Sequence, residues 1–375
     1  MRKPRAFLLY VEPTPYIEGL IKEIQRLWSG DLDVCYIAQD QSQDWKIDAK
    51  LSGGTILPVN RWRAITELRR SLGRLSRGDV VHLAGWGHPL LVAALLMGKL
   101  RGLRVFIESD TAAGQAVGGW KCVVRHVVYP PLFRLADHFL PGGKRQAAYL
   151  ASYGVPNTKT TTAQMTVDVA SIMRYVATAG EAARDALRAR LGYANDIWAV
   201  LYLGRLEPMK GVSDLLVGFA GIASRRGDVR LMIAGSGSLD SLVKEAAAVN
   251  PHISYLGQLS GTAVLDAYLA SDIVVAPSRF EPWGLVVNEA MACGRPIVAT
   301  DRVGCIDDLV AHGQTGFIVP AEAPHALSDA LELLVSNDRL REEMGAAATR
   351  RIAPWTLQNE AEIVVDCWNA RCHAY

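Results

Sequence analysis

The sequence has few cysteines and no paired ones, no long apolar run and no phosphate-binding loop of the Gly-x4-Gly-Lys-Ser/Thr type. The six cysteines are scattered without a Cys-x-x-Cys pair, which argues against a disulfide framework and an obvious zinc ribbon. They are Cys35, Cys122, Cys293, Cys305, Cys367 and Cys372. Isolated thiols of this kind are typical of a cytosolic protein, and we expect a cytoplasmic location.

No segment has the composition of a membrane span. The longest stretch without Lys, Arg, Asp or Glu covers residues 80–98, and it contains Gly85, His88 and Pro89. It therefore indicates strand, loop and helix rather than one apolar helix of about 20 residues. After the basic start, only Ala6–Val11 is apolar, which is shorter than the core of about 7–15 residues in a signal peptide. This pattern predicts a first buried strand.

The composition is that of an ordered globular protein. The chain has 375 residues, of which 50% are hydrophobic and 21% are charged, enough for about two domains. The net charge of +2 hides an asymmetry: residues 1–165 carry +9 and residues 166–375 carry −7. A basic half suggests contact with an anionic partner.

Apolar strands alternate with helical patterns along the chain, which predicts an α/β protein with parallel sheets. A polar, Thr-rich segment over 154–171 interrupts the alternation, which resumes at Ile197. We therefore expect two doubly wound domains, 1–165 and 166–353, with ligands in a cleft at the carboxyl ends of the strands. The tail from Ala323 is helical with a break at Pro354, and we expect its last helix, 354–375, to return to the first domain. Pro130-Pro131 is expected to break a helix over 117–136.

One candidate site follows the strand ending at Leu203. Gly204 and Gly211 let the backbone approach a ligand, and Arg205 and Lys210 add positive charge at a helix N-terminus. Backbone donors, the helix dipole and charge-assisted hydrogen bonds together suit a diphosphate. A solvated turn with incidental cations would have the same spacing.

A second candidate site spans residues 277–294. Glu281 lies in a loop after a strand, and Glu289 lies about one and a half turns into the following helix. The amides of Gly284, Leu285 and Val286 form a helix N-terminus, which is a second anion site. Carboxylates accept hydrogen bonds from hydroxyls, so this pair suits a sugar or ribose, although a pair on a solvated face would look the same.

These segments resemble the retaining glycosyltransferases of family 4, also called group 1. Glu281 and Glu289 match the Glu-x7-Glu signature of that family. The resemblance covers residues 197–320, and the other segments that carry it are Gly204-Arg205 with Lys210-Gly211, the Ile233–Gly237 turn, and the runs Gly294–Asp301 and His312–Pro320. It implies two Rossmann-like domains facing a cleft, the GT-B arrangement.

The resemblance also implies roles for individual residues. Arg205 and Lys210 would hold the donor diphosphate, Glu281 would contact the transferred sugar, and Glu289 would bind the ribose hydroxyls. The remaining donor-binding positions are expected to be backbone groups, and they are Gly204, Gly235, Gly237, Gly284, Leu285 and Val286.

The first half departs from the family pattern. Many members have a Gly-Gly loop after the first strand, whereas here Tyr16 and Gly19 follow it. Many also have a histidine in the cleft, and here Glu108, Asp110 or His88 would take its place.

The expected chemistry is separation of an oxocarbenium-like sugar from a phosphate anion. Arg205, Lys210 and a helix N-terminus can stabilise that anion, so neither a metal nor another cofactor is expected.

A basic helix over 61–77 forms a third feature. Its only acidic residue is Glu67, whereas it contains six arginines: Arg61, Arg63, Arg69, Arg70, Arg74 and Arg77. Trp62 is expected to join the apolar stripe that packs on the sheet. The arginines indicate either a solvated surface or docking to an anionic membrane; nucleic-acid binding is disfavoured because no aromatic stacking platform accompanies them.

The sequence therefore predicts a hexosyltransferase that moves a sugar from a GDP- or UDP-linked donor to a saccharide acceptor. The acceptor is either lipid-linked, in exopolysaccharide or surface-glycan assembly at the inner face of the membrane, or a small soluble molecule. A nucleotide-sugar epimerase on a similar fold and a non-enzymatic sensor are the alternatives.

Overall fold

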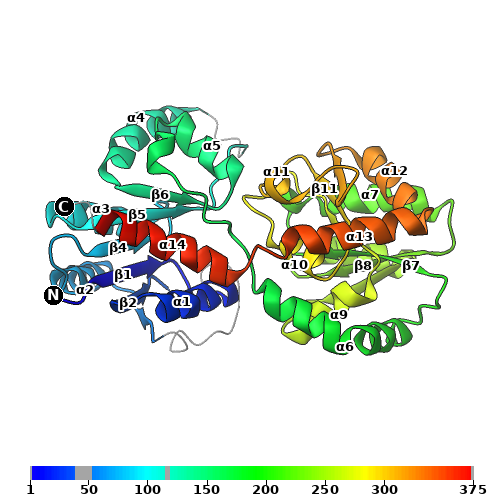
Figure 1. The fold of residues 1–375 in the computed structure, drawn as a ribbon. Coiled ribbons are helices and arrows are strands. Elements are labelled where there is room, and N and C mark those ends of the chain that lie inside the picture. Colours follow the sequence, from blue (N-terminus) through cyan, green and yellow to red (C-terminus); the bar gives the residue numbers. More distant parts are fainter. Residues whose placement is uncertain (1, 39–52, 115–118, 373–375) are drawn as a thin grey trace. The chain divides into compact units, whose positions relative to one another are not determined.

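The computed structural model describes residues 2–38, 53–114 and 119–372 (Figure 1). The chain divides into two compact units. Unit 1 contains residues 1–167 and 355–375, and unit 2 contains residues 168–354. Each unit is built on one parallel six-stranded sheet with helices between the strands, so the predicted α/β organisation is confirmed.

The sheet of unit 1 has the order β3-β2-β1-β4-β5-β6. Its strands are β1 (Arg5–Tyr10), β2 (Asp31–Tyr36), β3 (Thr55–Ile56), β4 (Val80–Leu83), β5 (Arg104–Ser109) and β6 (His138–Pro141). Its helices are α1 (Pro15–Leu27), α2 (Arg61–Gly73), α3 (Pro89–Leu100), α4 (Trp120–Leu135), α5 (Lys144–Ser152) and α14 (Leu357–Cys372), with a short 3₁₀ turn at Asn157–Lys159.

The sheet of unit 2 has the order β12-β11-β10-β7-β8-β9. Its strands are β7 (Trp198–Leu203), β8 (Val229–Ala234), β9 (Ile253–Gly257), β10 (Ile273–Ala276), β11 (Ile297–Thr300) and β12 (Gly316–Val319). Its helices are α6 (Val169–Arg190), α7 (Val212–Ala223), α8 (Asp240–Val249), α9 (Thr262–Ala270), α10 (Leu285–Ala292), α11 (Ile306–Leu309), α12 (Pro324–Val335) and α13 (Asp338–Ile352), with the 3₁₀ turn η3 (Pro208–Lys210) before α7.

Successive side chains of a strand point to opposite faces of the sheet, so each apolar strand contributes to the core on both faces. In β1, Phe7 and Leu9 join one core cluster, whereas Leu8 and Tyr10 join a second cluster on the other face. The second cluster includes Trp368 of α14, which is fully buried. The last helix of the chain therefore completes the core of unit 1.

In both sheets the order of the strands reverses direction at the centre. In unit 1 the chain leaves β1 in one direction and returns to β4 on its other side, and in unit 2 it does the same at β7 and β10. In open parallel sheets, ligands bind beside such a reversal, at the carboxyl ends of the strands. The loops after β1, β4, β7 and β10 are therefore the places to look for a site.

Two sequence predictions about local structure are wrong, and one helix was missed. Helix α4 continues through Pro130 and Pro131, where a break was predicted. Proline inside a helix removes a backbone hydrogen bond and costs stability; Phe133 of the same helix packs edge-on against Trp86. Helix α6 lies where no helix was predicted from the sequence, with its first residues in the polar segment 154–171. Trp62 is 77% exposed, so it does not belong to the buried stripe of α2.

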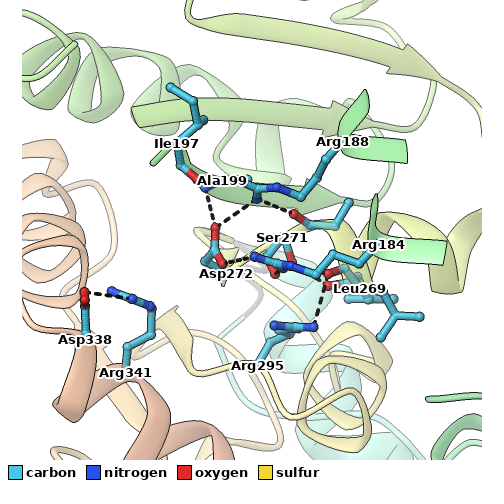
Figure 2. Close-up of polar contacts among 12 residues, drawn as sticks. Arg184, Arg188, Ile197, Ala199, Leu269, Ser271, Asp272, Arg295, Asp338 and Arg341 are labelled. Carbon is cyan, nitrogen blue, oxygen red and sulfur yellow. Dashed lines mark hydrogen bonds and ion pairs between the residues drawn. The ribbon is translucent and has the colours of Figure 1, made fainter. Parts of the chain in front are cut away.

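A buried network of charges fixes α6 against the sheet of unit 2 (Figure 2). Asp272, which directly precedes β10, accepts hydrogen bonds from Arg184 at 2.7 Å and from the backbone N–H of Ala199 at 2.8 Å. Arg188 lies 3.3 Å from the second carboxylate oxygen of Asp272. Because the aspartate is only 6% exposed, removing its partners would leave a buried charge uncompensated.

Across the described ranges, no helix is both long enough and apolar enough to span a bilayer.

Candidate functional site

The turn after β7 brings two sequence-predicted cations to the central reversal of unit 2. Residues 204–207 lead from β7 into η3, which ends at Lys210. Gly211 has a φ of +70°, and an added Cβ would lie 1.9 Å from the Pro277 carbonyl oxygen, so only glycine fits. Gly211 is also the N-cap of α7 and supplies no side-chain cap, which leaves the first helix amides to be satisfied by other groups.

The turn after β8 packs directly on this segment. Gly235 has a φ of +140°, and a Cβ there would lie 1.8 Å from the Gly204 carbonyl oxygen. A Cβ on Gly237 would lie 2.6 Å from the Leu206 carbonyl oxygen. Glu207 accepts hydrogen bonds from the Ser238 N–H at 3.1 Å and hydroxyl at 2.6 Å, and these bonds lower the pKa of Glu207. The two turns thus form one tightly packed surface with little room for side chains.

The loop after β10 brings Glu281 to the same place. Lys210 donates a hydrogen bond to the Glu281 carboxylate, and both side chains are mostly buried. The backbone of Glu281 is held by the loop after β11, through a bond from its N–H to the Arg302 oxygen at 3.2 Å and one from the Gly304 N–H at 2.9 Å. Lys210 and Glu281, which follow different strands of the central reversal, are therefore in direct contact. The predicted partner cation, Arg205, has an exposed side chain.

Helix α10 begins immediately after this loop. Its N-cap is Gly284, which has a φ of +102° and gives no side-chain cap to the following amides of Leu285 and Val286. Glu289 lies on α10 and accepts a hydrogen bond from the Tyr268 hydroxyl at 2.6 Å. Burial raises the pKa of Glu289 to about 6. The Glu289 carboxylate is therefore easier to protonate than that of a solvated glutamate.

The candidate residues of unit 1 separate into two groups. Tyr16, Glu108 and Asp110 line a cavity of about 270 Å³ at the carboxyl ends of the strands. His88 is not among the lining residues, and its Nδ1 accepts the Leu90 N–H at 3.2 Å as the N-cap of α3. Gly19 faces α14, and a Cβ there would lie 2.6 Å from Leu357 Cδ1. His88 therefore has a structural role as a helix cap, and Gly19 allows α1 to pack closely against α14.

Four further polar residues near this cavity were not singled out from the sequence. Tyr10, Glu12 and Glu360 line it, and His82 of β4 lies 3.1 Å from Glu108 without the geometry of a good hydrogen bond. Burial, followed by the charge of Glu108, raises the pKa of Glu360 well above its usual value. Glu12 could have been found from the sequence, because it lies in the loop that follows β1. Glu360 could not, because no neighbouring residue links it to a site formed by the first 165 residues.

Among the described residues, no group of three or more His, Cys, Asp or Glu side chains is arranged to hold a metal ion. The sequence does contain Asp31-Leu32-Asp33, but it opens β2, and Asp31 accepts a hydrogen bond from Arg5 at 3.2 Å. It lies at the amino end of the strand, whereas the cavity and the glycine turns lie at carboxyl ends.

Two family models match the chain. The model described as glycosyl transferases group 1 matches residues 183–351, and the model described as a glycosyl transferase 4-like domain matches residues 20–164. The first match contains every candidate residue of unit 2, and the second contains Glu108 and Asp110.

Curated relatives match over part of their length. A phosphatidyl-myo-inositol mannosyltransferase of Mycobacterium leprae is 39% identical over 165 residues, which are 43% of this chain and 44% of the relative. A D-inositol 3-phosphate glycosyltransferase of Arthrobacter is 32% identical over 195 residues, 50% of this chain and 46% of the relative. The matched region thus spans less than half of the length of these relatives.

Solved structures show the fold over the whole chain. HepE of Anabaena in complex with UDP aligns with a TM-score of 0.81 at 16% identity, covering 98% of this chain and 100% of HepE. A sucrose-phosphate synthase of Thermosynechococcus elongatus aligns with a TM-score of 0.74 at 19% identity, covering 98% and 99%. With both units matched by family models and both sheets reproduced in these neighbours, the chain belongs to the group 1 glycosyltransferases of the GT-B fold.

Proposed function

We propose that the protein is a retaining hexosyltransferase that uses a nucleoside-diphosphate sugar, with UDP or GDP as the nucleotide, and a saccharide acceptor. The observation that carries the proposal is the contact between Lys210 and Glu281 beside the glycine turns of unit 2. A cation is held there next to backbone that a phosphate can approach closely, and a carboxylate is held where a sugar hydroxyl would need an acceptor. HepE was solved with UDP and with UDP-glucose, which supports a nucleotide sugar as the donor class.

Each group of the unit 2 site has a task in this proposal. Lys210 and Arg205 neutralise the diphosphate, and the uncapped amides of α10 and α7 donate hydrogen bonds to its oxygens. When Lys210 turns to phosphate, Glu281 loses its partner and accepts a hydrogen bond from the sugar. Glu289 has one oxygen engaged by Tyr268 and uses the other for ribose hydroxyls.

The proposed reaction breaks the bond between the anomeric carbon and the leaving phosphate oxygen and forms a bond to the acceptor oxygen on the same face. The leaving phosphate takes the acceptor proton. Charge develops mainly on that phosphate, so fixed cations and amides stabilise the transition state more than the ground state.

Substitution of the two cations tests the proposal. We expect Lys210→Ala and Arg205→Ala each to lower transfer by about 10²–10³, which corresponds to loss of one preorganised charge. Lys244→Ala, on the exposed surface of α8 in the same unit, is the matched control. UDP or GDP at about 100 times its dissociation constant should stabilise the wild type by about 2.7 kcal/mol, and less at the same concentration in Lys210→Ala.

Two outcomes would contradict the proposal. Near wild-type turnover by both variants at saturating donor would remove the diphosphate role. Conversion of the donor sugar without any acceptor would instead indicate an epimerase, and nucleotide binding without any turnover would indicate a sensor.

A membrane surface is the proposed place of action, with a lipid-linked saccharide as acceptor in surface-glycan or exopolysaccharide assembly. All six arginines of residues 61–77 are exposed, and Arg70 alone pairs with Glu67. Trp62, exposed beside them, and Val59, fully exposed before α2, add apolar groups to this basic face. Basic side chains with an interleaved tryptophan suit the headgroup region of an anionic bilayer.

A further inference from the structure

Two backbone hydrogen bonds join the turn that carries Lys210 to the loop that carries Glu281. The carbonyl oxygen of Met209 accepts them from the N–H groups of Arg279, at 2.9 Å, and Phe280, at 3.2 Å. Met209 directly precedes Lys210, and Phe280 directly precedes Glu281. Because both bonds converge on one oxygen atom, they fix a point of contact between the two segments but not the angle at which the segments meet.

A pair of charged side chains bridges the same two segments. Arg279 donates to both carboxylate oxygens of Asp214, from Nε and from Nη2, each at 2.8 Å. Asp214 lies in the first turn of α7, four residues after Lys210. A guanidinium that meets a carboxylate with two parallel hydrogen bonds fixes orientation as well as distance. The pair therefore supplies the second anchor that the bonds to Met209 lack.

The same pair keeps a competing charge away from the site. Lys210 donates its hydrogen bond to Glu281, while the carboxylate of Asp214 is engaged by Arg279. Without that arginine, the Asp214 carboxylate would attract the Lys210 ammonium and draw it from Glu281. A further partner of Arg279 is Glu322, which lies 3.4 Å from Nη1 and is 65% exposed, so it adds only a weak, mostly solvated contact.

We propose that Arg279 is a positioning residue of the donor site, whose two bonds to Asp214 keep the Glu281 carboxylate beside Lys210. The inference rests on the proposed transferase function and adds to it the group that holds two segments of the site together. Arg279 acts through the loop and touches neither donor nor acceptor.

The other anchors of Glu281 make this role necessary. Its N–H donates to the Arg302 oxygen, and its carbonyl oxygen accepts from the Gly304 N–H, so its backbone is bonded to the loop after β11. Those bonds tie Glu281 to β11 and do not set its distance from the turn of Lys210. Without Arg279, that distance depends mainly on the single point of backbone contact.

A double-mutant cycle that needs no ligand tests the proposal. Lys210→Met, Glu281→Gln and the double variant are melted, and the departure of the double variant's Tm shift from the sum of the single shifts measures the coupling of the two side chains. The cycle is repeated with Arg279→Lys, which keeps the positive charge but loses the bidentate contact. We expect the coupling to fall to less than half. Arg279→Lys alone should lower Tm only slightly, because Arg279 is 40% exposed and exposed ion pairs add little to stability.

Arg226→Lys is the matched control. Arg226 follows the C-terminal end of α7 and also makes a bidentate contact with an aspartate, Asp228, through bonds of 2.9 and 2.7 Å. It thus lies at the opposite end of α7 from Lys210. The same loss of a bidentate contact there should leave the coupling between Lys210 and Glu281 unchanged.

Turnover provides a second readout. The probes are UDP-glucose and GDP-mannose, and release of the nucleoside diphosphate is measured with a panel of saccharide acceptors. For a donor that the wild type turns over, we expect Arg279→Lys to lower kcat about tenfold and to change the donor KM by less than about threefold, because a small displacement of a positioned group affects the transition state more than binding. In the Glu281→Gln background the further loss should be less than about twofold, because Arg279 acts through Glu281.

Four results would overturn the inference: no coupling in the wild type, coupling that Arg279→Lys leaves unchanged, coupling that Arg226→Lys lowers equally, or an unchanged kcat in Arg279→Lys. Failure of the wild type to release nucleotide from either donor would count against the proposed function instead. The melting cycle needs no ligand, so it would still decide whether Arg279 positions Glu281.

Discussion

Glu289 should make unit 2 less stable above its own pKa, and Glu289→Gln should relieve that penalty. Burial raises the pKa of this carboxyl to about 6, from about 4.5 for a solvated glutamate. The folded state therefore holds the proton more tightly than the unfolded state. The penalty is absent below about pH 4.5, grows between about pH 4.5 and 6, and is constant above that range.

The size of the penalty follows from the shift. About 1.5 pKa units at 1.36 kcal/mol each give about 2 kcal/mol at pH 7 or above. Glutamine does not titrate, and its amide oxygen can still accept the hydrogen bond from Tyr268. For a unit of this size, about 2 kcal/mol corresponds to about 4–8 °C in Tm. Burial of the amide adds an offset, but that offset does not depend on pH.

The assay is calorimetric melting of wild type and Glu289→Gln from pH 4.5 to 8, with Glu245→Gln on exposed α8 as the control. The difference in Tm between variant and wild type should grow by several degrees from pH 4.5 to 7 and then remain constant. At the same time, UDP or GDP should bind the variant about fivefold more weakly, because a charged acceptor for the ribose is lost. A difference in Tm that does not change with pH would refute the reasoning.

Three further predictions concern other parts of the chain. Gly235→Ala should destabilise unit 2 by about 1–3 kcal/mol and weaken nucleotide binding, because its Cβ would meet a carbonyl oxygen at 1.8 Å; Gly227→Ala, in open space, should be close to neutral in the same melts. Transfer should persist in EDTA, because fixed cations serve the diphosphate, and loss of activity that Mg²⁺ or Mn²⁺ restores would show the opposite. Changing Arg69, Arg70 and Arg74 to Glu should weaken binding to anionic vesicles, measured by sedimentation, by at least about 1 kcal/mol per residue, most clearly at low salt. Transfer to a detergent-soluble acceptor should stay unchanged. Wild-type protein that never sediments with such vesicles would favour a soluble acceptor.

The sequence was most informative where structure is local. The turn after β7 and the loop before α10 each carry glycines at positions where a Cβ would collide, as at Gly211. Such constraints act within a few residues and leave a readable pattern. The contact between Lys210 and Glu281 could be anticipated because both follow strands that flank the reversal of the sheet.

Other features depend on contacts between distant segments. Glu360 reaches a cavity built by the first 165 residues, and neither its neighbours nor its spacing indicates this. Helix α6 is stabilised by Arg184 and Arg188 against Asp272, more than 80 residues away. Trp62 was assigned to the apolar stripe by residue type, but its position in the first turn of α2 leaves it exposed.

The return of α14 to unit 1 has a consequence for synthesis of the protein. Unit 2 is one continuous segment, whereas unit 1 needs residues from both sides of it. Until α14 emerges from the ribosome, Leu20, Ile21 and Ile24 of α1 lack the apolar partners that α14 supplies. At about 5–20 residues per second, unit 2 takes about 10–40 s to be made. During that interval unit 1 waits as an incomplete domain with an exposed apolar face, so chaperone demand and sensitivity to proteases should be greatest there and should end when the last helix docks.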